Sequence, residues 1–310
     1  MIINTGMRTD IPAFYSEWFM NRIKEGYVYT RNPYYPKQVT KYYLNKEVVD
    51  CIDFCTKNPE PMLKYLDDLS EYNTLWYVTI TPYGKDIEPN VPNKDRVIKS
   101  FQKLSKKLNN SFVGLRYDPI FLNEEFTIER HIKEFKYILE NLKGYTTTCV
   151  ISFLDLYDKV KKNAPSLRPP TKVEQIILAK AFSKIGNENN IEIYTCCEGE
   201  FLSVYGLNTT GCKSDTIISK SIHYKIKPTK TRNVRTGCNC LMGSDIGAYN
   251  SCPHLCRYCY ANTNKELVIN NIKHHSKTSP LLIGNLEPDD KITIAKQQSY
   301  KVEKEQLTLF

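Results

Sequence analysis

Short apolar stretches alternate with longer segments whose apolar residues recur every three or four positions through the first 198 residues. The stretches are rich in Val, Ile, Tyr, Phe and Thr, which suit the half-buried surface of a sheet. They predict six strands, at residues 1–5, 48–55, 75–81, 112–116, 147–153 and 191–196. The segments between them predict amphipathic core helices, with apolar stripes over residues 14–23, 62–69, 97–108, 128–142 and 174–185.

Alternating strands and helices with short connections predict an α/β fold with parallel strands and right-handed crossovers. Both a barrel and an open doubly wound sheet fit this pattern. Polar residues at the strand ends, including Lys57 and Arg116, favour the barrel, because the carboxyl ends of barrel strands meet at one mouth where active sites form. We expect a partial or closed parallel βα barrel over residues 1–198. Residues 199–310 are expected to form a cysteine-rich region that returns to the barrel, with a polar tail from Glu287 that packs lightly or frays.

The composition is that of a globular protein, with 310 residues, of which 41% are hydrophobic and 25% charged. No apolar run is long enough to cross a bilayer, and the start of the chain has no pattern of a secretory signal. We therefore expect a cytoplasmic protein without a membrane partner. The net charge of +9 permits an anionic partner such as nucleic acid, although no single basic stripe supports one.

Cysteine is the most informative residue type, with 11 in the chain. In a cytoplasmic protein such richness indicates metal binding or catalysis more than disulfides. Cys252, Cys256 and Cys259 have the spacing Cys-x3-Cys-x2-Cys, with Tyr258 before the third cysteine. Three thiolates so close together can ligate three irons of a cubane cluster and leave the fourth iron open, as a catalytic metal requires. The bare pattern also fits part of a zinc site, with His254 as a fourth ligand.

This spacing resembles the signature of the radical S-adenosylmethionine (SAM) superfamily. The resemblance implies a 4Fe–4S cluster that binds SAM and cleaves it reductively to a 5′-deoxyadenosyl radical, with a partner such as flavodoxin or ferredoxin as the electron donor. The ending Tyr-Cys-Tyr-Ala at residues 258–261 looks like the branch that contains spore photoproduct lyase. Tyr258 and Tyr260 are accordingly expected beside the cofactor.

The motif lies near the end of the chain, whereas the superfamily has it after the first barrel strand. Residues 54–57 look like the third strand of the lyase barrel, which implies that Lys57 meets the SAM carboxylate. Residues 77–81, followed by Glu88 and Pro89, look like its fourth strand, with Thr79 and Thr81 on one face toward the cofactor. Circular permutation explains this order: the chain begins at the second strand, and residues 245–249 return as the first.

The whole chain resembles an uncharacterised bacterial group, the domain-of-unknown-function 1848 family. Four segments carry this resemblance, at residues 8–13, 56–59, 116–119 and 245–247. They read Arg-Thr-Asp-Ile-Pro-Ala, Thr-Lys-Asn-Pro, Arg-Tyr-Asp-Pro and Asp-Ile-Gly. The resemblance implies a radical-SAM-like protein and supplies no substrate.

A second metal site is predicted from the remaining clustered cysteines, Cys197, Cys212, Cys238 and Cys240. Four thiolates from separate segments can hold a second iron–sulfur cluster or a structural zinc ion. The alternatives are reduced thiols without a ligand, or a thiol that donates hydrogen to a substrate radical. Strand alternation sends Cys196 to the opposite face from Cys197, so only Cys197 is expected to ligate. The cysteines at 51, 55 and 149 lie in apolar strands and are expected in the core.

Arg116 and Asp118 share one strand face at the expected mouth, where they either pair or meet cofactor and substrate. Arg8 with Asp10 leaves the same two readings open, and Ser152 is a further candidate. The leading hypothesis is a radical SAM enzyme acting on a nucleic acid, a peptide or a small molecule. The second is a non-catalytic zinc or iron–sulfur module. The third is a βα-barrel enzyme in which Arg116, Asp118 and Lys57 perform acid–base chemistry.

Overall fold

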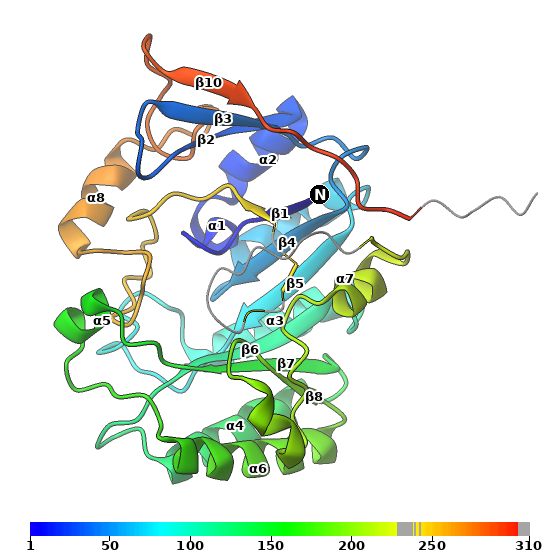
Figure 1. Cartoon of the computed structure of the whole chain (residues 1–310), viewed down its shortest axis with the longest axis vertical. Helices are drawn as coiled ribbons and strands as arrows, with labels where there is room; N and C mark the ends of the chain where they lie inside the picture. The colour runs from blue at the N-terminus through cyan, green and yellow to red at the C-terminus, as the bar shows by residue number, and fades with distance from the viewer. Residues whose placement is uncertain (228–237, 239, 242, 303–310) are drawn as a thin grey trace, which may run out of the picture.

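The computed structural model describes residues 1–302 except 228–237, 239 and 242. Its main feature is a sheet of seven strands, all of whose neighbouring pairs are parallel, in the order β9-β1-β4-β5-β6-β7-β8 (Figure 1). The strands are β1 (Ile2–Asn4), β4 (Cys51–Thr56), β5 (Thr74–Thr79), β6 (Val113–Ile120), β7 (Thr148–Phe153), β8 (Glu192–Thr195) and β9 (Ser244–Asp245). The parallel α/β fold and its six expected strands are thus confirmed.

The strands of this sheet follow chain order from β1 to β8, and β9 adds to the β1 edge. A doubly wound sheet reverses its strand order near the middle, and this sheet does not. The described strands leave β8 and β9 as the two ends of an open sheet, so they form no closed barrel. The strand expected at residues 245–249 does lie beside the N-terminal strand, although it comprises only Ser244–Asp245.

The two faces of the sheet have different covers. One face packs against the helices α2 (Ser16–Glu25), α3 (Lys94–Leu108), α4 (Ile128–Leu142) and α6 (Lys172–Asn189), and this core includes Trp76 of β5. On the other face, Tyr77 and Tyr194 pack with α7 (Asp215–Ile222) and several cysteines of the segment after β8. Neighbouring side chains of a strand point to opposite faces, which explains why Trp76 and Tyr77 belong to different cores. We call this second face the inner face.

Helix boundaries follow local signals in the sequence. Thr171 and Glu174 form a reciprocal capping box at the start of α6, and Asn93 caps α3. The stripe at residues 62–69 forms two 3-10 helices, η1 (Glu60–Tyr65) and η2 (Asp67–Leu69), where one α-helix was expected. The reason is local, because a proline donates no backbone N–H and two prolines lie at the beginning of this short segment. Five short helices of the described residues had no prediction: α1 (Ile11–Phe14), α5 (Asp158–Asn163), η3 (Glu200–Tyr205), α7 (Asp215–Ile222) and α8 (Lys265–Lys273).

The C-terminal tail belongs to a second, three-stranded sheet. β2 (Tyr27–Arg31) and β3 (Gln38–Tyr43) are antiparallel, and β10 (Lys291–Ile294) adds in parallel to β3. Asp290 forms an ion pair with Arg31 at 2.5 Å, and the amino group of Met1 donates to the carbonyl of Gln298 at 2.8 Å. Residues 287–302 are therefore not frayed, but they are largely exposed and pack lightly, as expected; residues 303–310 lie outside the described part. The tail is polar because backbone hydrogen bonds and ion pairs, more than apolar burial, hold it.

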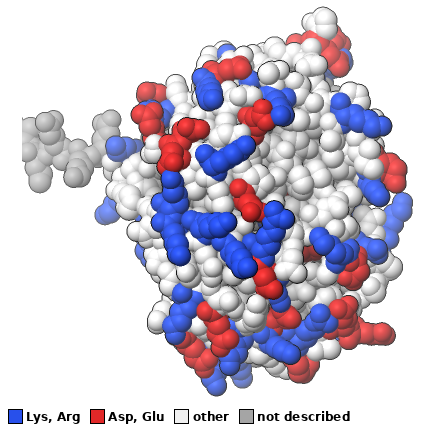
Figure 2. Space-filling model, turned by 180° about the vertical axis from the view of Figure 1, so that it is seen from behind, with Lys and Arg blue, Asp and Glu red and all other residues white. Residues whose placement is uncertain are grey.

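Charge is mixed on the molecular surface. On the face shown in Figure 2, Lys and Arg side chains lie close to Asp and Glu side chains over most of the area. In the part of the chain that the structure describes, none of the helices combines the length and the apolar composition that crossing a bilayer requires. The net charge of +9 is thus not gathered into a single basic surface on this face.

Candidate functional site

The cysteine motif occupies the loop that follows β9. Because β9 runs parallel to β1, with Asn4 opposite Asp245, this loop begins at the carboxyl edge of the sheet. Asp10 follows β1 and Lys57 follows β4 at the same edge. The structure thereby brings residues from the two ends of the chain to one place, as the strand-end pattern predicts.

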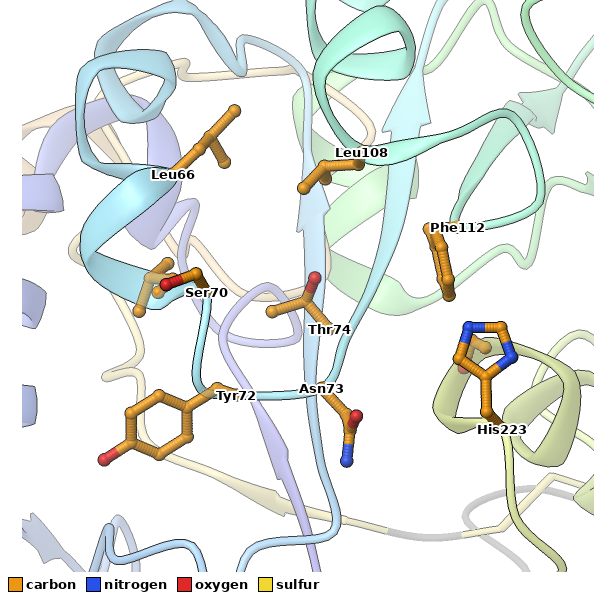
Figure 3. A pocket seen from close by; sticks show the side chains of 10 residues that line it. Leu66, Ser70, Tyr72, Asn73, Thr74, Leu108, Phe112 and His223 are labelled. Carbon is orange, nitrogen blue, oxygen red and sulfur yellow. The ribbon is translucent and has the colours of Figure 1, made fainter.

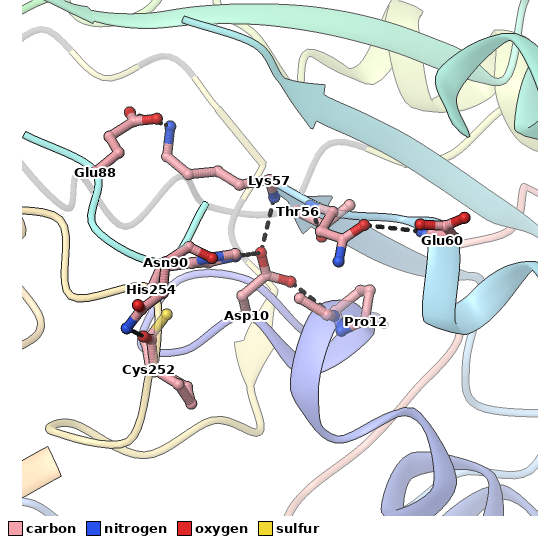
Figure 4. A network of polar contacts seen from close by, with 12 residues as sticks. Asp10, Pro12, Thr56, Lys57, Glu60, Glu88, Asn90, Cys252 and His254 are labelled. Carbon is pink, nitrogen blue, oxygen red and sulfur yellow. Dashed lines mark hydrogen bonds and ion pairs between the residues drawn. The ribbon is translucent and has the colours of Figure 1, made fainter. Parts of the chain in front are cut away.

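Asp10 is the residue that joins these segments (Figure 4). Its Oδ1 accepts from the backbone N–H of Ala13 at 3.0 Å and so caps α1. Its Oδ2 accepts from the backbone N–H of Lys57 at 2.7 Å and lies 2.9 Å from Nε2 of His254. Nδ1 of His254 lies 3.4 Å from the carbonyl oxygen of Asn90. Both ring nitrogens of His254 therefore face protein oxygens, which counts against His254 as a zinc ligand.

The buried carboxylate of Glu88 contacts three of the residues predicted to bind the cofactor. Its Oε1 forms an ion pair with Nζ of Lys57 at 2.9 Å and accepts from Oγ1 of Thr81 at 2.8 Å. The hydroxyl of Tyr258 donates to the same oxygen. Burial alone would lower the pKa of Lys57, but Glu88 and the nearby Cys256 outweigh it and raise that pKa. Lys57 is thus an ammonium group in a largely buried site, not in a surface salt bridge.

The motif cysteines are partly exposed residues that interact electrostatically with one another. Burial is the main cause that raises the pKa of each thiol, and Lys57 opposes this shift at Cys256 and Cys259. Among the described residues, no group of three or more His, Cys, Asp or Glu side chains is arranged ready to hold a metal ion. Thiols become ligands by losing their protons when a metal binds.

The loop is anchored on both sides. Its backbone meets the segment after β5, where the N–H of Arg257 donates to the carbonyl of Ile87 at 3.0 Å and the side chain of Asn90 donates to the carbonyl of Pro253 at 2.7 Å. The hydroxyl of Tyr260 donates to the carbonyl of Met7, and this side chain lies at the rim of the site with 44% of its surface exposed. The anchors fix the direction of the motif thiols relative to the sheet edge.

Arg116 and Asp118 pair with each other at the carboxyl end of β6. Nη2 of Arg116 lies 2.5 Å from Oδ2 of Asp118, and Oγ of Ser152 donates to Oδ1 at 2.9 Å. Thr79 lies opposite Arg116 in the sheet register. Asp118 also acts electrostatically on Lys57, so this pair belongs to the same mouth as the Glu88 network.

One of the two interpretations of Arg8 and Asp10 was that these residues, which follow β1, pair with each other. Arg8 does not pair with Asp10 in the described structure; its Nε lies 3.7 Å from Oδ1 of Asp245, and its guanidinium lies over the ring of Tyr249. Burial raises the pKa of Asp245 to about 6, although Arg8 and two backbone N–H groups oppose that shift. Arg8 thus fastens the strand that leads into the cysteine loop.

A second cluster of cysteines lies on the inner face of the sheet. Sγ of Cys212 is 3.5 Å from Sγ of Cys196 and 3.3 Å from Sγ of Cys240, and Sγ of Cys197 is 4.0 Å from Sγ of Cys196. Cys238 interacts with Cys240 and Cys197. These five residues are called the thiol cluster below, and all four predicted cysteines belong to it.

The exclusion of Cys196 from this cluster is wrong. Strand alternation does not apply, because β8 ends at Thr195 and Cys197 has a left-handed backbone with φ 65°. Both thiols consequently turn to the same side. Contacts with the neighbouring thiols hold the pKa of Cys196 well below its usual range and raise the pKa of Cys212 to about 11.

The other three cysteines differ among themselves. Cys149 lies in the helix-covered core, as predicted. Cys51 is also buried but packs on the inner face with the thiol cluster. Cys55 is only partly buried and packs against the same cluster, so the prediction of a core cysteine fails for it.

A cavity of about 150 Å³ lies away from both cysteine groups (Figure 3). It is formed at the amino end of β5, around Thr74, whereas the cysteine loop lies at the carboxyl edge of the parallel sheet. Leu66, Leu108 and Phe112 line much of it, with His223 at one side. Its position excludes this cavity from the site described above.

Two residues of the candidate site carry no strong signal in the sequence. Glu88 is marked only by the resemblance of its loop to the lyase family, which does not predict its burial. His254 is indicated only as a metal ligand. A carboxylate or imidazole that binds through tertiary contacts has no local spacing that marks it.

The fold and site define a parallel α/β protein with a cysteine loop at the carboxyl edge of its sheet. The sequence profile of the family described as Domain of unknown function (DUF1848) matches residues 2–261. The match covers most of the chain, which therefore belongs to this family. No curated protein and no solved structure matches the chain.

Proposed function

We propose that this chain is a radical SAM enzyme in which Cys252, Cys256 and Cys259 hold a 4Fe–4S cluster. The observation that carries the proposal is the pairing of β9 with β1, which delivers the cysteine loop to the carboxyl edge beside Lys57. When β9 is counted as the first strand, the seven strands run in sequential order across the sheet. The fold is then a circularly permuted, partial radical SAM barrel.

The residues present fit such a cluster. Three cysteines on one loop would ligate three irons and leave one iron open for SAM. His254 is engaged with Asp10 and Asn90, which disfavours a four-ligand zinc site at this loop. Two buried polar atoms of the segments around the loop, Oγ1 of Thr9 and Oδ1 of Asn262, have no hydrogen-bond partner in the described structure. Such atoms are expected where a polar group binds.

The cluster and SAM would supply the radical chemistry, and a donor such as flavodoxin or ferredoxin would supply the electron. The chain's own residues would bind and orient SAM. Lys57 has three ammonium donors, of which Glu88 accepts one, so others can meet the SAM carboxylate. Thr81 and Tyr258 hold the Glu88 carboxylate in position.

The rest of the mouth would serve the substrate. Tyr260 lies at the rim, where it can restrict the entry of water. Arg116 and Asp118 form a charged pair near the end of β6, and Asp118 interacts electrostatically with Lys57. We assign this pair to substrate contact, together with Thr79, which lies opposite Arg116 in the sheet. The net charge of +9, together with the resemblance of two strands to the spore photoproduct lyase barrel, supports a nucleic acid as one substrate class, beside a peptide or a small molecule, in a cytoplasmic protein.

The decisive experiment uses protein purified and reconstituted without oxygen, then mixed with SAM and dithionite. 5′-Deoxyadenosine is quantified by mass spectrometry for the wild type, Cys256→Ala and the matched control Cys149→Ala. Product from wild type and control, and none from Cys256→Ala, is expected. No nucleoside from wild-type protein with a reducible cluster, or equal product from Cys256→Ala, would overturn the proposal.

A further inference from the structure

We propose that the thiol cluster is a zinc site, in which Cys196, Cys212 and Cys240, with Cys197 or Cys238 as the fourth ligand, bind one ion. Each ligating thiol loses its proton to solvent, and no redox step is involved. The site is separate from the cysteine loop, and the inference does not depend on the proposed radical chemistry.

The described thiols do not form a ready-made metal site, but the spacing of their sulfurs suits a single metal ion. Four sulfurs at about 2.3 Å from a tetrahedral zinc ion lie about 3.8 Å from one another. The observed contacts are 3.3 Å, 3.5 Å and 4.0 Å, which bracket this value. A cubane cluster places several irons between its thiolates and so needs wider spacing. A disulfide needs about 2.05 Å, far shorter than any of these contacts.

The sequence positions of the ligands are those of a structural zinc site. Cys196 and Cys197 follow β8, Cys212 precedes α7, and Cys238 and Cys240 precede β9. The sulfurs that meet at Cys212 are 16 and 28 residues apart from it along the chain. An ion bound here would close two long loops and hold the segment after β8 on the inner face of the sheet.

Two cations lie close to the thiols of the cluster. The guanidinium of Arg116 interacts with Cys196 and Cys212, and the ammonium of Lys213, which forms an ion pair with Asp53, interacts with Cys212. Positive charges beside a site of four thiolates offset part of its negative charge. The hydroxyl of Tyr77 donates to the carbonyl of Cys212 and fixes this ligand to β5. All-sulfur tetrahedral sets suit zinc, with iron as the competing metal.

The test uses the full chain with Cys252, Cys256 and Cys259 all replaced by Ala, so that any metal found belongs to the thiol cluster. We expect about one zinc per chain by mass spectrometry of the metal content, in protein purified without added metal. Adding Cys212→Ser or Cys240→Ser should lower the zinc content at least tenfold, and adding Cys149→Ser should leave it unchanged. Zinc content that stays the same after Cys212→Ser and Cys240→Ser would overturn the site.

Iron with inorganic sulfide in the triple variant would also overturn the proposal, in favour of a second iron–sulfur cluster. So would metal-free protein whose cluster thiols all react with a thiol reagent. If the serine variants do not fold, X-ray absorption at the zinc edge of the triple variant replaces them. Four sulfur neighbours at about 2.3 Å are then expected, and a shell containing nitrogen or oxygen contradicts the assigned ligands.

Discussion

Nε2 of His254 lies 2.9 Å from Oδ2 of Asp10, although 244 residues separate the two in sequence. Both side chains are buried, and the same carboxylate oxygen accepts from the backbone N–H of Lys57. One carboxylate thus connects the first helix, the end of β4 and the cysteine loop. This contact explains how a loop near the end of the chain is held against the strands that begin it.

Replacing Asp10 with Asn should loosen the cysteine loop. The substitution keeps the shape of the side chain, but places an NH2 group or a weaker acceptor opposite two donors, Lys57 N–H and His254. We expect the free energy of unfolding to fall by about 3 kcal/mol, since a buried charged hydrogen bond is lost. Iron retained after reconstitution should fall severalfold. Urea denaturation measures the loss of stability and iron analysis measures the retained iron, with the exposed Asp68→Asn as control. Equal iron in the wild type, Asp10→Asn and Asp68→Asn would contradict the role of Asp10 in holding the cysteine loop.

The pairing of Lys57 with Glu88 allows a test that separates an effect on SAM binding from an effect on the stability of the fold. Lys57→Met should raise the KM for SAM at least tenfold, which corresponds to about 1.4 kcal/mol of lost binding. It also leaves the buried Glu88 without its cation, which destabilises the fold. The double variant Lys57→Met, Glu88→Gln should recover stability but keep the high KM. Recovery of the wild-type KM by the double variant would show that Lys57 acts only by neutralising Glu88. The exposed Lys64→Met serves as the matched control.

The sequence was sufficient where a local pattern has one structural outcome. Six strands with alternating helices predict the parallel sheet, and the return of β9 beside β1 follows from the order of the motifs. The resemblance to spore photoproduct lyase predicts that Lys57, Thr81 and Tyr258 lie together. It does not predict that the buried carboxylate of Glu88 joins them. A single carboxylate has no periodicity, and its partners lie in three separate segments.

The predictions that the structure contradicts failed for physical reasons. Alternation was extended from β8 to Cys196 and Cys197, beyond the last strand residue, where a left-handed backbone turns both thiols to one side. The strands β2, β3 and β10 carry many polar residues because their sheet is only partly buried, so no apolar run marks them. Their stability comes from pairing between distant segments, which a local pattern does not show.

Removal of residues 287–310 should destabilise the protein, contrary to what a frayed tail would predict. Truncation after Leu286 deletes β10 and the partner of Arg31. It also removes Ser299 and Tyr300, which donate to the buried carboxylate of Asp50 at 2.5 Å and 2.8 Å. We expect a loss of about 3 kcal/mol in the free energy of unfolding, from unsatisfied polar groups around Asp50.

Thermal and urea unfolding of the truncated chain measure this loss. Ser299→Ala in the full chain should cost about 1 kcal/mol, because it removes one of the hydrogen bonds to Asp50. Lys296→Gln, an exposed change in the same tail, is the control. A truncated chain as stable as the full one would show that the contacts of residues 287–302 contribute nothing.

His131 should make stability depend on pH in a predictable direction. The imidazole is fully buried, with Nδ1 2.8 Å from the hydroxyl of Tyr117 and Nε2 2.8 Å from the carbonyl oxygen of Phe121. A carbonyl only accepts, so Nε2 carries the proton and Nδ1 accepts from Tyr117. Burial lowers the pKa of His131 from 6.5 to about 4, which the Phe121 carbonyl only partly opposes.

Between pH 4 and 6.5 the unfolded chain binds a proton at His131 that the folded chain does not. The free energy of unfolding therefore rises with pH across this window, and acidification from 6.5 to 4 removes up to roughly 3 kcal/mol. His131→Gln should be less stable at pH 7 but should lose less on acidification, because glutamine does not titrate. Urea denaturation at pH 4.0 to 7.5 measures the difference between the two slopes, with the exposed His274→Gln retaining the wild-type slope. Identical slopes for wild type and His131→Gln would mean that His131 is not kept neutral by burial.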